Sequence, residues 1–415
     1  MNESFINNDP LVIRQHIIKL FGQLAIRCTT LERKYRDESI NKFILQRCDN
    51  YITNPKSMIN SILERHRRRV TIDRVLVTNI DDNSQTLVTD QDKIKVHVNA
   101  HFQQVAGGAQ PRQTLSPRWA AQYSPIARIN EHWYDRIMDP PSIDEWSNIV
   151  SHLANGKAPG PSGVSNEMIK HVGPKMSKAI WQLVRLCCIY QDIPKGWREA
   201  TVYPIPKPMN WESNLNKTRP ITLLETIRKA LVRLINSRLS KVMVHHSILR
   251  GGNHAGLPGG STLEPLRIVN AILEDARASK KELWILFQDM SKAYDRVNIH
   301  MLDLAMQRIK FPLALRSLLS NLFTKRTNQV ITAHGLTTLY DVLIGIDQGE
   351  VISPLFWTIY YDPLLCEVNQ QSHIGYTISH TWFKKLNDVT DIGHASFPMT
   401  FSVSTISLSI TTKRN

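Results

Sequence analysis

The segment LFQDMSKAYDRV, residues 286–297, brings together side chains that are suited to metal and phosphate chemistry. It includes the end of an apolar run, KELWILF, which is typical of a β-strand and would deliver Asp289 to the end of that strand. A carboxylate there can ligate a divalent cation, but the same residue type also caps helices and forms salt bridges. Tyr294 and Asp295 follow, and Asp295 is placed to cap the next helix. The neighbouring segments must decide between these alternatives.

Two further segments place a cation at the end of a strand. WREATVYPIPKP, starting at Trp197, is a short strand-like run that is closed by prolines around Lys207. TRPITLLETIRK follows from Thr218, with Arg219 ahead of a proline and then an amphipathic helix. Neighbouring strands that each carry a cationic end would hold a triphosphate, although an ordinary surface charge is the alternative for Lys207.

A glycine turn before a helix is the next candidate site. In GIDQGEVISPLFWTIYY, Ser353 is placed to cap a helix that has Pro354 at its first position. Gln348 and Gly349 would then be held just before a helix N-terminus, where a base or a phosphate is readily bound.

The charge balance of the chain favours a polyanionic partner. The 415 residues include 51 Lys plus Arg against 36 Asp plus Glu, a formal net charge of +15. Nucleic acid and an anionic membrane surface are the two candidates. Apolar runs are too short to cross a bilayer, and the start, MNESFINNDP, lacks the pattern of a secretory signal. We therefore expect an intracellular protein of the nucleus or cytoplasm, not a secreted one, with nucleic acid rather than membrane as its partner.

Metal binding through cysteine is not indicated. The five cysteines include no C-x-x-C pair, which argues against a disulfide framework and against a cysteine-based zinc module.

Six segments in the same order resemble the successive blocks of one family. They are KAPGPSG, WREATVYPIPK, TRPITLLETIRK, NHAGLPGGST, FQDMSKAYD and GIDQGEVISPLF. Over roughly residues 120–380, the chain resembles the reverse transcriptase domain of non-LTR (LINE-like) retrotransposons. The resemblance implies an RNA-directed DNA polymerase that acts on an RNA template, a DNA primer and deoxynucleoside triphosphates. It also implies two Mg²⁺ ions that support nucleotidyl transfer.

The resemblance implies an α+β fold, with the fingers and part of the palm of a right-handed polymerase after a mainly helical N-terminal region. We expect five regions along the chain: helices at 1–70, a hairpin and linker at 71–119, fingers at 120–282, a partial palm at 283–382, and a divergent tail at 383–415 that packs poorly or is disordered.

By resemblance, Asp289 is the first catalytic, metal-binding carboxylate, with the main-chain carbonyl of Met290 beside it. Tyr294 takes the place of the aromatic residue that crowds the 2′-position of the incoming sugar. The nucleotide-binding residues are completed by the finger residues Lys207 and Arg219, which grip the triphosphate, and by the turn residues Gln348 and Gly349, which lie against the nascent base pair.

The chain departs from the family after the glycine turn. The family's next palm block is an aromatic residue, any residue and two adjacent aspartates, and the resemblance stops at Trp382 without it. The one adjacent pair, Asp81 and Asp82, comes far earlier, in the polar turn of the expected hairpin. The thumb block is also absent from this sequence.

Two hypotheses follow from this departure. The chain is either a reverse transcriptase fragment that is inactive by itself, with one weakly held Mg²⁺ at most, or a non-catalytic nucleic-acid-binding remnant that uses the basic fingers. The abrupt change of composition after Trp382 also suggests a frameshift or a splicing product. We expect the missing block in another reading frame just downstream of that codon.

Overall fold

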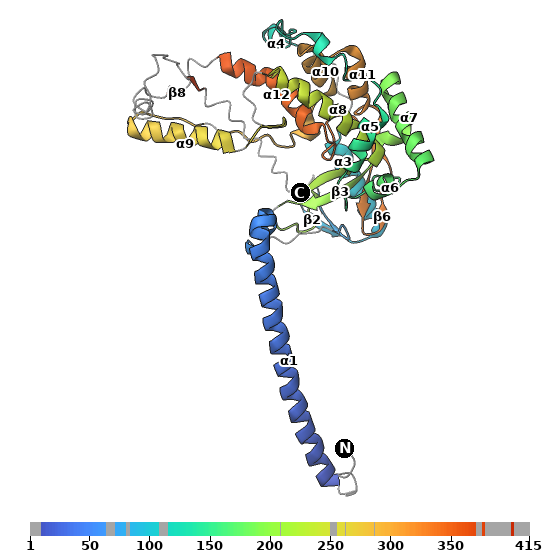
Figure 1. The fold of residues 1–415 in the computed structure, drawn as a ribbon, viewed down its shortest axis with the longest axis vertical. Coiled ribbons are helices and arrows are strands. Elements are labelled where there is room, and N and C mark those ends of the chain that lie inside the picture. The colour runs from blue at the N-terminus through green and yellow to red at the C-terminus, as the bar shows by residue number, and fades with distance from the viewer. Residues whose placement is uncertain are drawn as a thin grey trace. The chain divides into compact units, whose positions relative to one another are not determined.

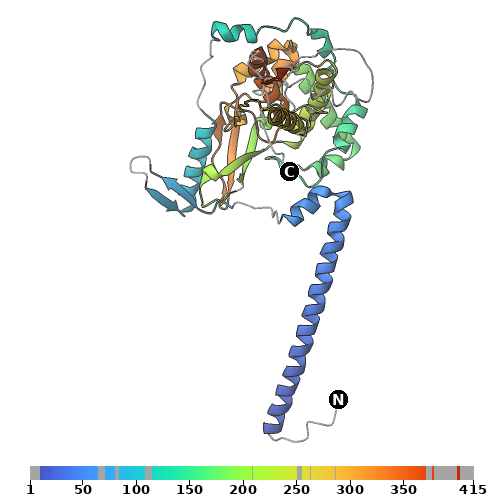
Figure 2. The same ribbon diagram turned by 90° about the vertical axis from the view of Figure 1, so that its left-hand side faces the viewer.

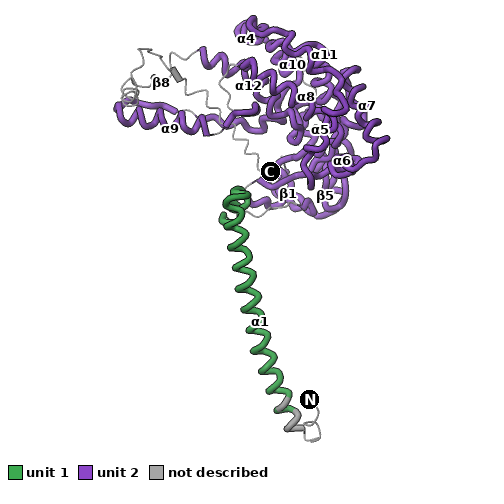
Figure 3. Tube along the Cα trace, viewed as in Figure 1, with its two compact units in different colours: residues 1–69 green, residues 70–415 purple. Residues whose placement is uncertain are grey.

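The structure is a computed structural model, and it describes residues 10–63, 71–79, 84–107, 115–207, 209–249, 255–261, 263–285, 287–370, 376–377 and 400–401. The chain divides into two compact units, residues 1–69 and residues 70–415 (Figure 3). Within the described ranges, no helix is both long enough and apolar enough to cross a membrane.

The first unit consists of two helices, α1 (Pro10–Thr53) and α2 (Pro55–Ile62). Asn54 separates them, and its side-chain oxygen accepts the N–H of Ser57 at 3.1 Å. This bond satisfies a donor that the first turn of α2 would leave unpaired, and Pro55 has no N–H to satisfy. The chain therefore ends one helix and begins the next within a single residue.

The second unit is built on a mixed sheet of five strands (Figure 2). The central strand β3 (Glu199–Pro206) pairs antiparallel with β4 (Thr218–Leu223) and parallel with β5 (Arg326–Thr332). Strand β5 pairs antiparallel with β6 (Gly335–Leu336) and with β7 (Tyr340–Val342). The predicted neighbours β3 and β4 are confirmed, and helices with a mixed sheet confirm the α+β class.

A helix that was not predicted covers part of the sheet. Helix α3 (Gln91–Val105) lies within the stretch expected to be a hairpin and linker. Ile94, Val98 and Phe102 recur every four residues, so they share one face, and this face is buried against Val202 and Val330 of the sheet. The linker segment 108–114 lies outside the described residues. The expected hairpin is present as β1 (Val75–Thr78) and β2 (Gln85–Val88).

Six of the other described helices of the second unit supply the larger core beside the sheet (Figure 1). Leu231, Leu234 and Ile235 of the longest of these helices are fully buried there, each contributing about 1.5–3 kcal/mol by leaving water. These core helices are α5 (Ile143–Ser151), α7 (Pro174–Tyr190), α8 (Thr226–His245), α10 (Ile299–Arg308), α11 (Leu313–Asn321) and α12 (Ser353–Gln370). Helices α4 (Pro117–Gln122), α6 (Asn166–Lys170) and α9 (Leu263–Ala278) contribute no residue to this core.

Short 3₁₀ turns and one small ladder complete the described elements. The turns are η1 (Glu131–Tyr134), η2 (Lys195–Arg198), η3 (Leu215–Lys217) and η4 (Tyr294–Arg296), and the ladder joins β8 (Tyr376–Thr377) to β9 (Thr400–Phe401). Apart from 400–401, the predicted divergent tail at 383–415 lies outside the described residues.

The KAPGPSG segment docks onto the junction between β4 and α8. The carboxylate of Glu225 accepts the N–H of Ser162 at 2.7 Å and its hydroxyl at 2.6 Å. A Cβ on Gly160 would lie 2.6 Å from the main-chain nitrogen of Glu225, so the approach requires glycine. Two of the six sequence blocks are thereby held together.

The strand predicted for KELWILF is wrong. Residues 281–285 and 287–290 have no regular structure, and the side chains of Trp284 and Phe287 are 83% and 72% exposed. A strand is stable when a neighbour satisfies its N–H and C=O groups, and no described strand pairs with this stretch. Apolar composition alone therefore did not produce a strand, and Asp289 does not lie at a strand end.

Candidate nucleotide and template site

The glycine turn meets the end of the FQDMSKAYD block through main-chain contacts. The N–H of Gly345 donates to the carbonyl of Val297 at 2.8 Å, and that of Ile346 donates to the carbonyl of Tyr294 at 2.9 Å. Gly345 has a φ of +81°, and a Cβ there would lie 2.8–2.9 Å from the carbonyl oxygens of Asp295 and Tyr294. Only glycine allows this approach.

The other side of the turn lies against β4. The N–H of Thr222 donates to the carbonyl of Gln348 at 3.2 Å. A Cβ on Gly349 would collide with the carbonyl oxygen of Thr222. Arg219 is three residues earlier on the same strand. The turn is thus held between β4 and the 294–297 segment, so that both Gln348 and Gly349 lie beside β4.

Asp295 is the carboxylate that the structure brings to this turn. The side-chain amide of Gln348 donates to its two oxygens at 3.2 and 3.3 Å. Burial raises the pKa of Asp295, while the Gln348 hydrogen bond and the charges of Lys292 and Lys207 oppose that rise. The positive charges of Lys292 and Lys207 therefore stabilise the same carboxylate that Gln348 hydrogen-bonds.

The helix-capping role predicted for Asp295 is wrong. Asn298 caps α10, because its side-chain oxygen accepts the N–H of Met301 at 3.1 Å. The predicted cap at Ser353 is also wrong, since its hydroxyl donates to the main-chain carbonyl of Asp347 at 2.9 Å. In both cases the side chain bonds outside the helix that follows it.

Lys207 and Arg219 lie at the same end of the β3–β4 pair. Ile205 is directly opposite Arg219, and the N–H of Lys207 donates to the carbonyl of Lys217 at 2.8 Å. The ammonium of Lys207 donates to the carbonyl of Asn216 at 2.7 Å, whereas the Arg219 side chain is exposed. Because side chains alternate along a strand, Lys207 lies on the same sheet face as Ile205 and Arg219.

Tyr294 is half-buried next to α12. Its ring centroid lies 6.2 Å from that of Trp357, with an angle of 56° between the ring planes. Burial raises the pKa of its hydroxyl. Packing against Trp357 limits the freedom of the ring, and the main-chain bond to Ile346 ties it to the glycine turn.

Asp289 and Met290 are not part of this arrangement in the described structure. Both side chains are exposed, and Asp289 makes no hydrogen bond or ion pair among the described residues. The amide of Gln288 donates to the sulfur of Met290 at 3.6 Å, which is a local contact. The structure therefore separates the predicted metal ligands from the contacts that unite Tyr294, Gln348 and Gly349.

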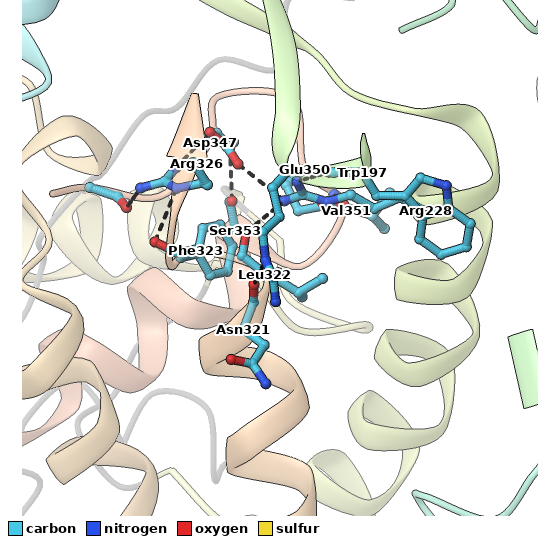
Figure 4. Close-up of polar contacts among 12 residues, drawn as sticks. Trp197, Arg228, Asn321, Leu322, Phe323, Arg326, Asp347, Glu350, Val351 and Ser353 are labelled. Carbon is cyan, nitrogen blue, oxygen red and sulfur yellow. Dashed lines mark hydrogen bonds and ion pairs between the residues drawn. The ribbon is translucent and has the colours of Figure 1, made fainter. Parts of the chain in front are cut away.

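A buried network of four charged residues holds the glycine turn in place (Figure 4). Arg228 of α8 is fully buried and bonds to Glu350 at 3.0 Å and to Asp347 at 3.2 Å. Arg326 of β5 bonds to Asp347 at 2.7 Å and also to the carbonyl of Gly345 at 2.8 Å. Charge-assisted bonds in a desolvated site are strong and directional. The network fixes both flanks of Gln348 and Gly349.

The sequence carried a signal for this network that was missed. Arg228, Leu231 and Ile235 share one face of α8, and Leu231 and Ile235 are fully buried. A charged residue on an apolar face requires a buried partner. Asp347 and Glu350 in GIDQGE were candidates for that role, because each flanks the turn.

His101 of α3 also lies in the field of the two lysines. Burial first, and then the charges of Lys292 and Lys207, lower its pKa to about 4. The ring is therefore neutral in the folded chain at neutral pH. This histidine was not singled out from the sequence, and it belongs to the helix that was not predicted.

The lowered pKa of His101 predicts a loss of stability in acid. Since the unfolded ring has a pKa near ~6.5, the unfolded chain binds the proton first as the pH falls. Stability then decreases from about pH 6.5 down to the folded value near 4. We expect His101→Gln to flatten this part of the curve of unfolding free energy against pH, measured by urea denaturation. His97→Gln, one turn earlier on α3, is the control, and an equal flattening there would contradict the assignment.

The second unit thus combines a mixed sheet and helices with two cationic residues at one end of the β3–β4 pair and a glycine turn bonded to β4. Residues 205–381 match the family described as reverse transcriptase (RNA-dependent DNA polymerase). This match identifies a reverse transcriptase domain at residues 205–381, and the transposon relatives described next support the LINE-like type inferred from the six blocks.

Curated relatives of transposon origin are each similar to about half of the chain. A probable RNA-directed DNA polymerase from transposon BS of Drosophila melanogaster is 26% identical over 227 residues, which is 55% of this chain and 25% of the relative. One from transposon X-element of the same species is 29% identical over 217 residues, covering 52% and 24%. The polyprotein of the type-1 element R2 of Popillia japonica is 24% identical over 222 residues, covering 53% and 30%. The chain thus spans about a quarter of the length of the first two relatives.

Reverse transcriptases are nucleotidyltransferases that generally use Mg²⁺. The donors predicted for it are the Asp289 carboxylate and the Met290 carbonyl, on an exposed stretch without regular structure. Among the described residues, no three His, Cys, Asp or Glu side chains converge on one point. Two adjacent cations need several carboxylates to offset their repulsion, so this donor set does not fit a two-metal centre.

Proposed function

We propose that the second unit binds an RNA template, a DNA primer and a deoxynucleoside triphosphate between the β3–β4 strand ends and the glycine turn. The observation that carries this proposal is the position of the turn, which is bonded to β4 at Thr222 and to the 294–297 segment at Tyr294. The finger strand and the turn therefore form one continuous surface. Family membership supplies the class of ligand.

Each side chain contacts the part of the ligand that suits its chemistry. Lys207 and Arg219 grip the triphosphate, since an ammonium and a guanidinium both bond to phosphate oxygens. Gln348 and Gly349 face the nascent base pair, where the absence of a side chain at 349 allows close approach. Tyr294 lies against the sugar and crowds its 2′-position. Lys292 adds positive charge to the same region.

We further propose that this chain does not polymerise nucleotides by itself. Asp289 is exposed and makes none of the turn contacts, and the sequence from Ile352 to Asn415 contains no adjacent pair of aspartates. Asp295, the carboxylate that does reach the turn, is engaged by Gln348. Binding without catalysis is then the remaining activity, and it agrees with the net charge of +15.

Binding measured over a series of salt concentrations distinguishes the proposed site from general attraction of nucleic acid to the basic chain. We expect the Lys207→Ala/Arg219→Ala double variant to weaken binding of an RNA–DNA template-primer, because each residue neutralises a phosphate. The slope of log affinity against log salt should become shallower by about 1 for each phosphate that is no longer neutralised. Fluorescence anisotropy of a labelled primer measures this.

The matched control is Lys175→Ala/Lys178→Ala, which removes the same charge from exposed positions on α7. Equal weakening in both double variants would contradict the proposed site.

Primer extension with Mg²⁺ tests the proposal that the chain does not polymerise nucleotides by itself. Extension by the wild-type chain that Asp289→Asn abolishes would show that the chain is a polymerase and that the inactivity proposal is wrong.

A further inference from the structure

Helix α1 carries a continuous apolar stripe that its own chain leaves exposed. The stripe residues occur at alternating intervals of four and three positions, and the apolar ones among them are 47–76% exposed. Cys28, which belongs to the same series, is also exposed. The series is Ile17, Phe21, Leu24, Cys28, Leu31 and Tyr35.

This spacing is typical of the residues that form the seam of a coiled coil. Intervals of four and three average about 3.5 residues, close to the 3.6 of an α-helix, so the stripe stays on one side for many turns. The d positions are Ile17, Leu24 and Leu31, and the row continues at the same seven-residue interval, after Glu38, to Leu45 and Ile52. The a positions are Phe21, Cys28 and Tyr35.

The flanking charges identify the occupant of this seam. In a parallel coiled coil, the residue just before each a position is position g, and the residue just after each d position is position e. Position g of one helix lies opposite the position e that is five residues farther along the other helix. Arg27 and Glu32 hold these two positions, so two copies of α1 in register form this ion pair twice. An antiparallel arrangement instead brings Arg27 and Lys34 of one helix towards the same cations of the other. The charge pattern is therefore complementary to a second copy of this chain in parallel orientation.

We propose that residues 17–35 of α1 form a parallel, in-register coiled coil with α1 of a second copy of this chain, making the protein a dimer. The interface is independent of the proposed nucleic-acid site, because it lies wholly on the first unit. Each copy covers the apolar seam of the other, which is what drives such association.

A pair of substitutions on the same helix tests the seam. Leu24→Glu places a charge in it, whereas Ile26→Glu places one about 200° around the helix, on the opposite face. Both leucine and isoleucine are exposed in the single chain, at 58% and 71%. Sedimentation equilibrium of the full chain should show a dimer for the wild type and for Ile26→Glu. For Leu24→Glu, the dissociation constant should rise by at least about tenfold.

Orientation is tested by exchanging the flanking charges and by cross-linking. Arg27→Glu and Glu32→Arg should each weaken the dimer, and the double variant should restore it. A short bismaleimide should join Cys28 to Cys28 of the second copy in the wild type and in Cys48→Ser, but not in Cys28→Ser. A monomeric wild type, an equal effect of Leu24→Glu and Ile26→Glu, or no restoration by the charge exchange would overturn the proposal.

Discussion

Arg228→Met should lower the free energy of unfolding by about 3–5 kcal/mol, the range for breaking a buried ion pair at one partner. The guanidinium is fully buried and bonds to two carboxylates and to the carbonyls of Trp197 and Leu322. Methionine matches much of its length but bonds to none of them. Asp347 keeps Arg326, whereas Glu350 loses its guanidinium and retains the N–H of Val351. Urea denaturation followed by circular dichroism measures the decrease.

Two further variants distinguish charge from packing at Arg228. Arg233→Met, on the same helix and half-buried, is the control and should change stability by less than about 1 kcal/mol. Arg228→Met combined with Glu350→Gln should destabilise the chain by less than the sum of the two single variants, because the glutamine carries no charge to leave unpaired.

The sign of the pH dependence gives a second readout for Arg228→Met. Burial raises the pKa of Glu350 and Arg228 opposes that rise, so removing Arg228 raises the pKa further. A carboxyl whose pKa is higher in the folded chain is destabilising above that value, and the destabilisation disappears below the unfolded value near ~4.3. The difference in stability between variant and wild type should therefore narrow as the pH falls. A difference that is constant with pH, or additive effects of the two single variants, would contradict the role of charge.

Gly349→Ala should destabilise the chain by about 1–3 kcal/mol, because the added Cβ is overpacked against the main chain. It would collide with the carbonyl oxygen of Thr222, a backbone atom of β4 that cannot rotate away as a side chain does. The turn must then separate from β4. We expect weaker binding of the RNA–DNA template-primer together with the lower unfolding free energy.

Gly196→Ala is the matched control for the glycine turn. A Cβ at Gly196 has no neighbour within 4 Å, and neither glycine has a positive φ. The two substitutions therefore share the same entropic effect on the unfolded chain and differ in the space available. Similar stability and binding for Gly349→Ala and Gly196→Ala would show that the turn does not depend on its contact with β4.

The successful sequence predictions concern features with local signals. The β3–β4 pair was readable because proline-bounded apolar runs mark short strands, and α8 because its apolar residues follow the helical period. The placement of Lys207 and Arg219 at one end of the pair followed from their positions next to those prolines. Their roles in binding remain predictions.

The failures concern partners that are distant in sequence. KELWILF has the composition of a strand, but pairing depends on a neighbouring strand. Asp295 was expected to bond to the helix beginning after it, yet its partner, Gln348, is 53 residues away. Helix α3 was missed because Ile94, Val98 and Phe102 lie among polar residues, and the sheet that buries them is formed by segments farther along the chain.

By itself, the sequence determined the family and the order of its blocks. The six motifs can be recognised from their residue types and their order, without knowing which residues are in contact. It also determined the basic character of the chain and the seven-residue repeat of α1. Only the tertiary structure decided which carboxylate reaches the glycine turn and which charges hold that turn in place. The physical reason is that burial and hydrogen bonding are properties of segments brought together by folding, and a residue type states what it can bond to but not what it meets.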